Sequence, residues 1–329
     1  MSVRIVRGIG TGMTLGGLVL LASVAGAGLL AMIMGPAAVA ADAGRTEGPA
    51  IQLVETWPIE TDLDNPEIPD AHEVWLSMIE DATVSLDLAQ FYASNDPDSR
   101  LETIIQAVEA AADRGVRVRF LAEERFYRTY PGTLDRLGAR DGIEMRRFDV
   151  SAIMGGVLHA KYFIVDRREV FVGSQNFDWR ALTHIQELGV RVRVPEIAQT
   201  FSQVFDLDWS LAAGIRLETH IDRGEDPPFP VVVAAGGDSL RLTPVFSPRD
   251  YVPDGLPWDL PRLVDLIDSA ERTVRLQLLT YRTVGRDGTY FDTLESALRR
   301  AAARGVTVQL LLADWSRRPG TIEGLQSLQ

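Results

Sequence analysis

Cysteine is absent from this chain of 329 residues. The absence excludes a disulfide framework, a thiolate zinc site, an iron–sulfur cluster and a cysteine nucleophile. Lysine is almost absent too, because 32 of the 33 basic residues are arginine and only Lys161 is lysine. A residue type used once in a whole chain draws attention to its position, and Lys161 stands two residues after a histidine.

Positive charge is scarce overall, since 33 basic residues face 46 acidic ones and give a net charge of −13. Indiscriminate binding to long duplex nucleic acid needs a broad basic surface that releases counterions, and this composition argues against it. A small, locally positive pocket is still compatible with it. The 46% hydrophobic content beside 24% charged residues is typical of a folded chain and excludes wholesale disorder.

Acidic residues are missing from residues 1–41, which carry Arg4 and Arg7 and then the uncharged, largely apolar stretch Gly8–Val39. The small residues Ala38–Ala40 resemble a signal-peptidase site. About 20 apolar residues also suffice to span a bilayer. We therefore expect residues 1–41 to be a signal peptide or a signal anchor. The rest of the chain would be exported, either secreted or held by the membrane outside the cytoplasm.

The chain resembles itself at a separation of 190 residues. Thr83–Leu88 is similar to Thr273–Leu278, and eight positions from Ala107 to Leu121 recur from Ala297 to Leu311 without a gap. Each copy has an alternating apolar segment, a segment with apolar spacing of 3.6 residues, a glycine and a second apolar run. This pattern predicts a βαβ unit in each copy, and so an α/β fold of two similar lobes with mixed central sheets.

The predicted elements divide the chain into five parts. In the first lobe we expect strands near 83–92, 116–122, 143–148 and 188–194, helices near 101–114, 132–137 and 195–211, and a hairpin over 159–173. The predicted parts are the export segment 1–41, a polar linker 42–65, the first lobe 66–211, a connector 212–237 and an incomplete second lobe 238–329. The connector is predicted from its glycine, proline and acidic residues.

His159 and Lys161 stand at the start of the first strand of the predicted hairpin. Residues two apart on a strand share a face, so the imidazole and the ammonium can meet one phosphate group. Asp166 lies an odd number of positions further on, at the turn, and is expected to brace the site. The return strand brings Ser174 and Asn176 back beside His159, where a hydroxyl and an amide can donate hydrogen bonds.

The pattern His-x-Lys-x4-Asp-x6-Gly-Ser-x-Asn, complete from His159 to Asn176, resembles the signature of the phospholipase D superfamily. The spacing to Glu187 resembles that of the family's carboxylate, which hydrogen-bonds the catalytic histidine and orients its ring. The segments Gly173–Gly189 and Leu76–Tyr92 are similar to the membrane-anchored branch that includes lysosomal 5′-exonucleases of single-stranded nucleic acid. The resemblance implies a phospholipase D-like fold in which each lobe supplies one such motif.

The resemblance also implies a mechanism. One histidine attacks phosphorus to form a phosphohistidine, the other protonates the leaving oxygen, and water or an alcohol resolves the intermediate. The implied catalytic residues are His159, Lys161, Asp166 and Glu187, and the implied phosphate ligands are Lys161, Ser174 and Asn176. No metal or other cofactor is required. The implied substrate is a phosphodiester in a phospholipid or at a single-stranded nucleic-acid end.

The sequence departs from the family pattern because it contains no second His-x-Lys motif. By the repeat, the partner of His159 would fall near position 349, beyond the printed residues. Three expectations follow. The chain is a fragment of a longer enzyme, or it completes its site by forming a homodimer, or it is a non-catalytic, membrane-tethered phosphate-binding module.

Three other groups of residues have both a functional and a structural interpretation. The remaining histidines, expected at the surface, are His72, which we place before a helix, His184 and His220. Aromatic residues that could stack on a base or a lipid glycerol, or simply pack, are Phe91, Tyr92, Phe126, Tyr127 and Tyr130. Arginines that could attract phosphate, or form a solvated face, are Arg146, Arg147, Arg167 and Arg168.

Overall fold

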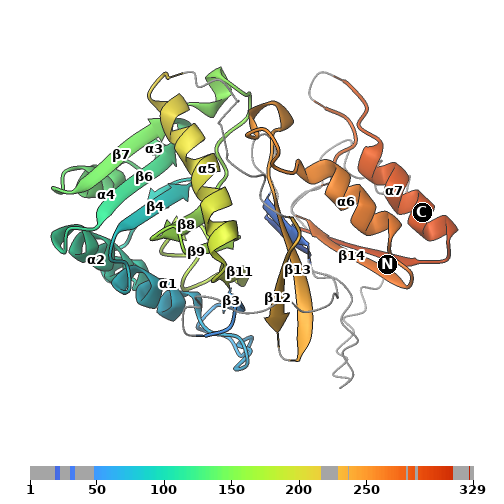
Figure 1. Ribbon diagram of the computed structural model, residues 1–329, viewed down its shortest axis with the longest axis horizontal. Coiled ribbons are helices and arrows are strands. Elements are labelled where there is room, and N and C mark those ends of the chain that lie inside the picture. Colours follow the sequence, from blue (N-terminus) through green and yellow to red (C-terminus); the bar gives the residue numbers. More distant parts are fainter. Residues whose placement is uncertain are drawn as a thin grey trace.

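A mixed sheet of seven strands forms the centre of the first lobe in the computed structural model (Figure 1). The structure describes residues 19–22, 30–33, 48–215, 229–235, 237–278, 281–285, 288–313 and 326. In spatial order the strands are β3 (Ile51–Thr56), β11 (Glu187–Val192), β9 (Glu169–Gly173), β8 (Lys161–Val165), β4 (Ser85–Gln90), β6 (Arg117–Glu123) and β7 (Ile143–Phe148). β4, β6 and β7 are parallel to one another, and the other neighbours pair antiparallel.

Helices cover both faces of this sheet, so its strands are buried on both sides. The helices α1 (Ala71–Glu80) and α2 (Arg100–Asp113) pack on one face around Trp75, whose ring lies 5.2 Å from that of Phe171. The long helix α5 (Pro195–Ala212) covers the other face. The smaller elements are α3 (Glu124–Tyr127), α4 (Gly132–Gly138), the 3-10 turn Val150–Ala152, and the paired short strands β5 (Ala93–Ser94) and β10 (Phe177–Asp178).

The predicted α/β class is confirmed, and the expected strands and helices of the first lobe are present within a few residues of their predicted ends. The predicted linker 42–65 is wrong at residues 51–56, which form the edge strand β3 against β11 with Val54 fully buried. The prediction that His72 precedes a helix is also wrong. The carboxylate of Asp70 accepts from the backbone N–H of His72 and caps α1, so His72 lies in the first turn.

The second lobe contains the predicted βαβ unit. Its elements are α6 (Asp259–Asp268), β14 (Thr273–Leu278), α7 (Thr293–Ala303) and β15 (Thr307–Leu312), with β14 and β15 parallel. A separate antiparallel sheet has the order β1 (Val19–Ala22), β2 (Leu30–Ile33), β13 (Asp238–Val245) and β12 (Val231–Ala235). Because β12 pairs with β13, the predicted connector 212–237 is wrong at residues 231–235.

An arginine makes the same contact in both lobes. The positions of its partners correct the separation of 190 residues for the segments that precede the second helix of each lobe. In the first lobe Arg114 Nη2 donates to the carbonyl of Ile79 at 3.1 Å, and in the second Arg304 Nη2 donates to that of Ile267 at 3.0 Å. The arginines are 190 positions apart, but the carbonyls are 188 apart. The sequence match between the first strands of the two copies is therefore wrong by two residues. An even shift keeps every side chain on its predicted face, because strand side chains alternate.

The predicted export segment 1–41 lies outside the described residues, apart from the backbones of β1 and β2. His220 lies outside them as well. Within the described part of the chain, no helix combines the length and the apolar character needed to cross a membrane.

Candidate active site

The structure brings His159 and Lys161 together at one edge of the large sheet. Lys161 begins β8 and pairs with Gln90, the last residue of β4. β4 and β6 run parallel, so their carboxyl ends meet at this edge, where ligand sites of α/β sheets gather. Lys161 Nζ lies 2.6 Å from His159 Nδ1 and donates to the His159 carbonyl at 3.2 Å. The spacing of two residues thus places both groups on one face, as expected.

The surroundings of His159 favour the neutral imidazole. Its ring lies 4.3 Å from that of Phe91, and Lys161 Nζ lies 5.2 Å from the centre of the same ring. Burial, followed by the positive charge of Lys161, lowers the pKa of His159 to about 3. A neutral ring keeps a lone pair on one nitrogen at physiological pH, so His159 suits the role of nucleophile rather than that of acid.

Lys161 and Glu187 form the charged centre of the site. Lys161 is only 6% exposed, and this burial lowers its pKa to about 7 against the opposing attraction of Glu187. Burial raises the pKa of Glu187 to about 8, although the charge of Lys161 and a hydrogen bond from Ser174 favour the carboxylate. Both groups therefore change charge close to neutral pH, and an anion placed between them would hold Lys161 in its charged form.

The segment after β9 places Ser174 and Asn176 near these residues. The backbone N–H of Ser174 donates to Leu188 O at 3.0 Å, and Ser174 Oγ accepts from Leu188 N at 3.3 Å. This pairing holds Ser174 beside Glu187 at the start of β11. The side-chain oxygen of Asn176 is buried and has no hydrogen-bond partner among the described residues. Oδ1 is an acceptor, so a phosphate oxygen would have to be bound by the amide N–H groups of Asn176 instead.

Several other buried polar atoms of this region lack partners within the described chain. They are Oε1 of Gln90, both amide atoms of Gln175 and Oε2 of Glu187. Unpartnered buried polar atoms are rare in native proteins, so a group of them indicates a place that a polar ligand or water fills. Gln175 was missed from the sequence, although it stands inside the Gly-Ser-x-Asn motif. Its side chain is completely buried against Gly173 and Gly189.

Asp166 stands at the turn, where the hairpin predicted a bracing rather than a reacting residue, although the family motif counts it among the catalytic residues. Asp166 directly follows the far end of β8, five residues after Lys161. Its carboxylate accepts from the backbone N–H groups of Thr83, Val84 and Ser85 at 2.7 to 3.3 Å, and these bonds lower its pKa. Asp166 therefore ties the β8–β9 turn to the start of β4. It braces the sheet and lies away from the reacting group.

The structure also differs from the expected contact between Glu187 and His159. No hydrogen bond joins these two side chains in the described structure. The near neighbour of the His159 ring is instead Lys161, and Glu187 acts on the charge of Lys161. The ring of His159 is therefore positioned by Lys161 and Phe91, and Glu187 affects it through the lysine.

Four of the five aromatic residues lie in a continuous series that starts at His159. Phe91 contacts His159, and its ring centre is 4.0 Å from that of Phe126. Phe126 stacks on Tyr92 at 5.9 Å, and Tyr92 stacks on Tyr130 at 5.1 Å. We call Phe91, Tyr92, Phe126 and Tyr130 the aromatic wall. Tyr127 lies apart from it, because its hydroxyl donates to Asp135 and its ring contacts Arg147.

The four arginines do not gather into a phosphate site. Arg146 lies over the Trp209 ring at 4.2 Å, Arg147 contacts Glu124 at 3.3 Å, and Arg167 pairs with Asp206 at 2.7 Å. Arg168 stands in the β8–β9 turn, where its N–H donates to Val165 O. These contacts favour the interpretation as a structural, solvated face.

Two other histidines lie in the described part of the chain, where His184 is exposed and His72 is half-buried. His72 contacts Thr103 Oγ1 at 2.7 Å, and burial lowers its pKa. His184 is exposed and pairs with Glu60 at 2.5 Å. Within the described ranges, no group of three or more His, Asp or Glu side chains is placed to hold a metal ion.

Several known proteins are similar to this chain. The family described as "Cardiolipin synthase, PLD-like domain" matches residues 75–209, which contain every predicted site residue. The 5′-3′ exonuclease PLD3 of Bos taurus is 28% identical over 284 residues, covering 80% of this chain and 58% of that protein. Phospholipase D Z of Dictyostelium discoideum is 25% identical over 292 residues, covering 82% and 68%. The chain thus spans 58% of the length of that exonuclease.

A solved structure is also similar over part of the chain. Nuc from Salmonella typhimurium, described as a phospholipase D family member, has 27% sequence identity and a TM-score of 0.40. The alignment covers 50% of this chain and 95% of Nuc.

Proposed function

The chain belongs to the phospholipase D superfamily, and from this premise we propose that its site cleaves phosphodiesters with His159 as the nucleophile. One observation carries the proposal. A neutral imidazole is held against Lys161, the only lysine of the chain, and the buried Lys161 ammonium is the group that would bind an anion there. This combination offers a nucleophile and an anion-binding group at one point.

The reaction would proceed in two steps. The lone pair of the His159 ring attacks phosphorus, a nitrogen–phosphorus bond forms, and the bond from phosphorus to the leaving oxygen breaks. Water then attacks the phosphohistidine, the group that protonated the leaving oxygen takes a proton from this water, and the nitrogen–phosphorus bond breaks to regenerate the imidazole. Lys161 and the amide of Asn176 stabilise the charge on the phosphoryl oxygens in both steps. Ser174 supports the site through its bond to Glu187.

The leaving oxygen of the first step must receive a proton. The printed sequence contains one His-x-Lys motif, and the neutral His159 cannot serve as both nucleophile and acid in the same step. We assign the acid to a second histidine, supplied by a further chain segment or by a second copy of the protein. This assignment follows the superfamily resemblance.

The substrate is either a single-stranded nucleic-acid end or a phospholipid. The 5′-3′ exonuclease and the phospholipase D among the relatives support these two classes. We place the reaction outside the cytoplasm, in a secreted or membrane-attached protein. Support for that location comes from the basic, then apolar, acid-free pattern of residues 1–41.

A side-by-side assay tests the proposal. A labelled oligonucleotide with a 5′-hydroxyl and a vesicle of phosphatidylcholine are incubated with the protein, and released nucleotide and released choline are measured. Cleavage of either substrate supports a phosphodiesterase and identifies its class. The alternative, a non-catalytic phosphate-binding module, predicts saturable binding of one substrate with release of neither product.

The charge state of the site predicts that anion binding weakens as the pH rises. Lys161 has a pKa of about 7 and loses its positive charge above it, while Glu187, with a pKa of about 8, gains negative charge. Both changes disfavour an anion. We expect the affinity for sulfate, whose own charge is constant here, to fall by up to about tenfold per pH unit between 7 and 8, where Lys161 titrates, and by up to about a hundredfold per unit above 8, where both groups do. Calorimetric titration from pH 6 to 9 measures it.

The matched control for this prediction is Lys161→Met, which keeps the length of the side chain and removes the titrating group. Its sulfate affinity should be weak at pH 6 and should change less with pH than that of the unaltered protein. An affinity of the unaltered protein that is constant from pH 6 to 9 would contradict the prediction.

A further inference from the structure

The aromatic wall ends at a pocket. A cavity of about 370 Å³ lies beyond Tyr130, a volume in the range of small-molecule sites. Its polar lining consists of Ser94, Asn95, Thr129, Tyr130, Thr133 and Arg136. Since Tyr130 belongs both to the wall and to the pocket, the wall connects the His159 side chain to this cavity through a series of ring contacts.

Tyr130 is held in a fixed orientation. Its ring stacks on Tyr92 at 5.1 Å, and the guanidinium of Arg180 lies 6.0 Å from its centre. Arg180 in turn donates to both oxygens of Asp178, and the hydroxyl of Tyr92 is hydrogen-bonded to the same carboxylate. Burial, followed by the charge of Asp178 and this hydrogen bond, raises the pKa of Tyr92. Tyr92 covers one face of the ring and Arg180 lies over it, so a flat ligand would contact the part of Tyr130 that lines the pocket, and that part needs no further ordering.

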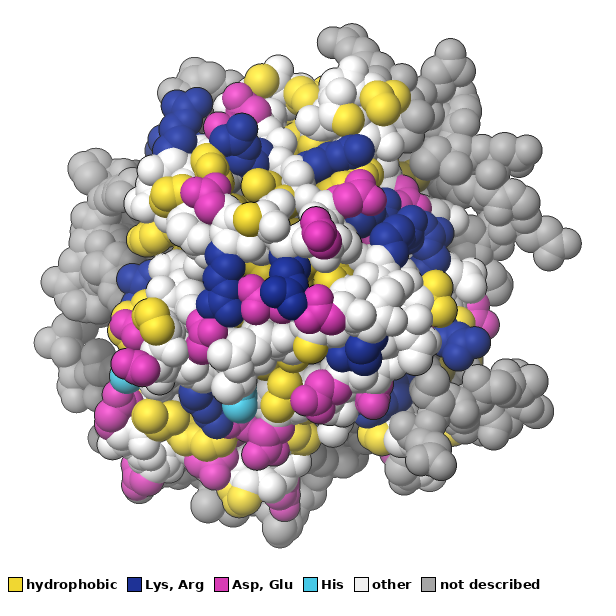
Figure 2. All heavy atoms as spheres, turned by 90° about the vertical axis from the view of Figure 1, so that its left-hand side faces the viewer, with side chains coloured by type: hydrophobic (Ala, Val, Ile, Leu, Met, Phe, Trp, Pro, Cys, Tyr) yellow, Lys and Arg dark blue, Asp and Glu magenta, His cyan; other side chains and the backbone are white. Residues whose placement is uncertain are grey.

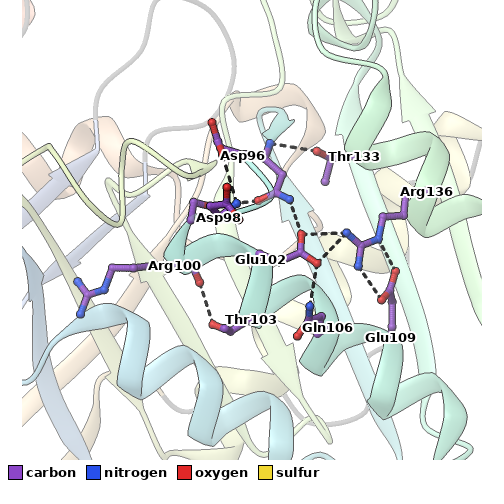
Figure 3. A network of polar contacts seen from close by, with 11 residues as sticks. Asp96, Asp98, Arg100, Glu102, Thr103, Gln106, Glu109, Thr133 and Arg136 are labelled. Atoms are coloured by element: carbon purple, nitrogen blue, oxygen red, sulfur yellow. Dashed lines mark hydrogen bonds and ion pairs between the residues drawn. The ribbon is translucent and has the colours of Figure 1, made fainter.

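The charge around the pocket selects against a phosphate. Figure 3 shows the Arg136 guanidinium between two carboxylates. Its nitrogens lie 2.9 Å from Glu102 and 2.7 Å from Glu109. Asp96 and Asp98 stand on the neighbouring loop. Arg136 is therefore neutralised by its partners, and the rim has an excess of negative charge. A second phosphate would be repelled here, whereas a neutral group would not.

The lining is mixed, since Ala93, Pro97, Ile105, Pro131 and Gly132 stand beside the polar residues. A hydrocarbon would remove solvent from the ion pairs of Arg136 without replacing its hydrogen bonds. A nucleobase has a flat face for stacking and polar edges. Thr133 Oγ1 already accepts from the Asn95 N–H, and Asn95 Nδ2 donates to Glu102, so the edges of a base would meet the hydroxyl hydrogen of Thr133 and the second amide hydrogen of Asn95. On the face drawn in Figure 2, basic and acidic side chains alternate among the described residues, so recognition through one small pocket fits that surface better than a long basic track.

We propose that the aromatic wall and the Tyr130 pocket form a binding site for a nucleobase of a single-stranded substrate whose phosphodiester lies at His159. The inference rests on the proposed function and adds the part of the molecule that chooses nucleic acid over lipid. Tyr130 and Tyr92 are its specificity-determining residues, and they contact the base rather than the reacting phosphorus.

Equilibrium binding tests the inference with the full chain. A fluorescently labelled oligothymidylate and the same strand made abasic are titrated with the protein, and anisotropy gives the dissociation constants. Tyr130→Ala should weaken binding of the oligothymidylate by about tenfold, the usual scale of one base–aromatic stack. Removing the bases should have a similar effect, and Tyr130→Ala should not weaken binding of the abasic strand further, because both changes delete the same contact.

Two variants serve as controls. Tyr130→Phe keeps the ring and should retain most of the affinity for the oligothymidylate. Tyr127→Ala removes a neighbouring tyrosine that lies outside the wall and should leave the affinity unchanged. Equal weakening of both strands by Tyr130→Ala would overturn the inference, and so would unmeasurable binding of the oligothymidylate. Displacement of the strand by phosphatidylcholine vesicles, with loss of that competition in Tyr130→Ala, would assign the pocket to lipid and also overturn it.

Failure of the proposed function gives a different result. In that case the protein still binds the oligothymidylate in a base-dependent manner but cleaves no phosphodiester. Conversely, cleavage of the abasic and the base-containing strand at equal rates and equal affinities leaves the proposed function standing and removes the base site.

Discussion

Replacement of His159 by alanine should abolish phosphodiester cleavage, lowering kcat by about four orders of magnitude or more. The substitution removes the imidazole to which the proposed mechanism assigns the bond to phosphorus, so Lys161 and Asn176 would hold a substrate without that nucleophile. The fold should survive, because His159 precedes β8 and is partly exposed. Steady-state cleavage of the better substrate, with circular dichroism for the fold, measures both outcomes.

A matched control and a rescue make this result specific. His184→Ala removes a histidine that is exposed and paired with Glu60, and it should leave kcat unchanged. Added imidazole should restore part of the activity of His159→Ala, since it can enter the space beside Phe91 and supply the missing nitrogen. Cleavage by His159→Ala at the rate of the unaltered protein would exclude a phosphohistidine at this position.

The site residues that can be predicted from the sequence are those that lie close to one another along the chain. His159 and Lys161 are two residues apart on an apolar strand, and strand geometry alone brings their side chains to one face. Ser174 and Asn176 follow from the same hairpin, because a return strand must end beside the start of its partner. Local periodicity therefore determines most of the phosphate-binding groups before any tertiary contact is known.

The parts that could not be predicted depend on distant partners. The strand β3 has the polar residues Gln52 and Glu55 and is specified by β11, more than 130 positions later. Asp166 matches a catalytic motif, but its acceptors are occupied by backbone donors of residues 83–85. Neither pairing can be recognised from the order of polar and apolar residues in the segment itself. The aromatic wall is a similar case, since Phe91 and Phe126 meet only when the parallel strands β4 and β6 end side by side.

The two-residue error in the repeat has a physical cause. A strand with alternating apolar residues matches its own pattern again after a shift of two residues. Thr273–Leu278 therefore aligns with the first copy in two registers that superpose the apolar residues about equally well. The helices carry no such ambiguity, because a shift of two residues turns the apolar face away from the sheet. The contacts of Arg114 and Arg304, which join helix to helix in each lobe, distinguish the two registers.

Gly189 lies where the sheet is packed most tightly behind the site. It faces Gly173 across the β9–β11 pair, and a Cβ at position 189 would lie 2.4 Å from Phe171 Cζ and 3.0 Å from Gln175 Oε1. The Phe171 ring cannot move aside, because it is buried between Trp75 and Phe163, at ring-centre distances of 5.2 and 5.5 Å. Both glycines of the pair are therefore required by the side chains packed over them.

Gly189→Ala should consequently lower the free energy of unfolding by about 3 kcal/mol, the upper end of the usual cost of overpacking a core. Denaturant titration followed by tryptophan fluorescence measures it. Gly132→Ala is the matched control, since a Cβ there meets no atom within 4 Å and the residue lies in the first turn of α4. Its stability should stay equal or rise by a few tenths of a kcal/mol, because alanine restricts the unfolded chain. Equal midpoints and slopes for both variants would show that Phe171 and Gln175 can shift at no cost in stability. Gln175 would then not be a fixed part of the packing against Gly173 and Gly189.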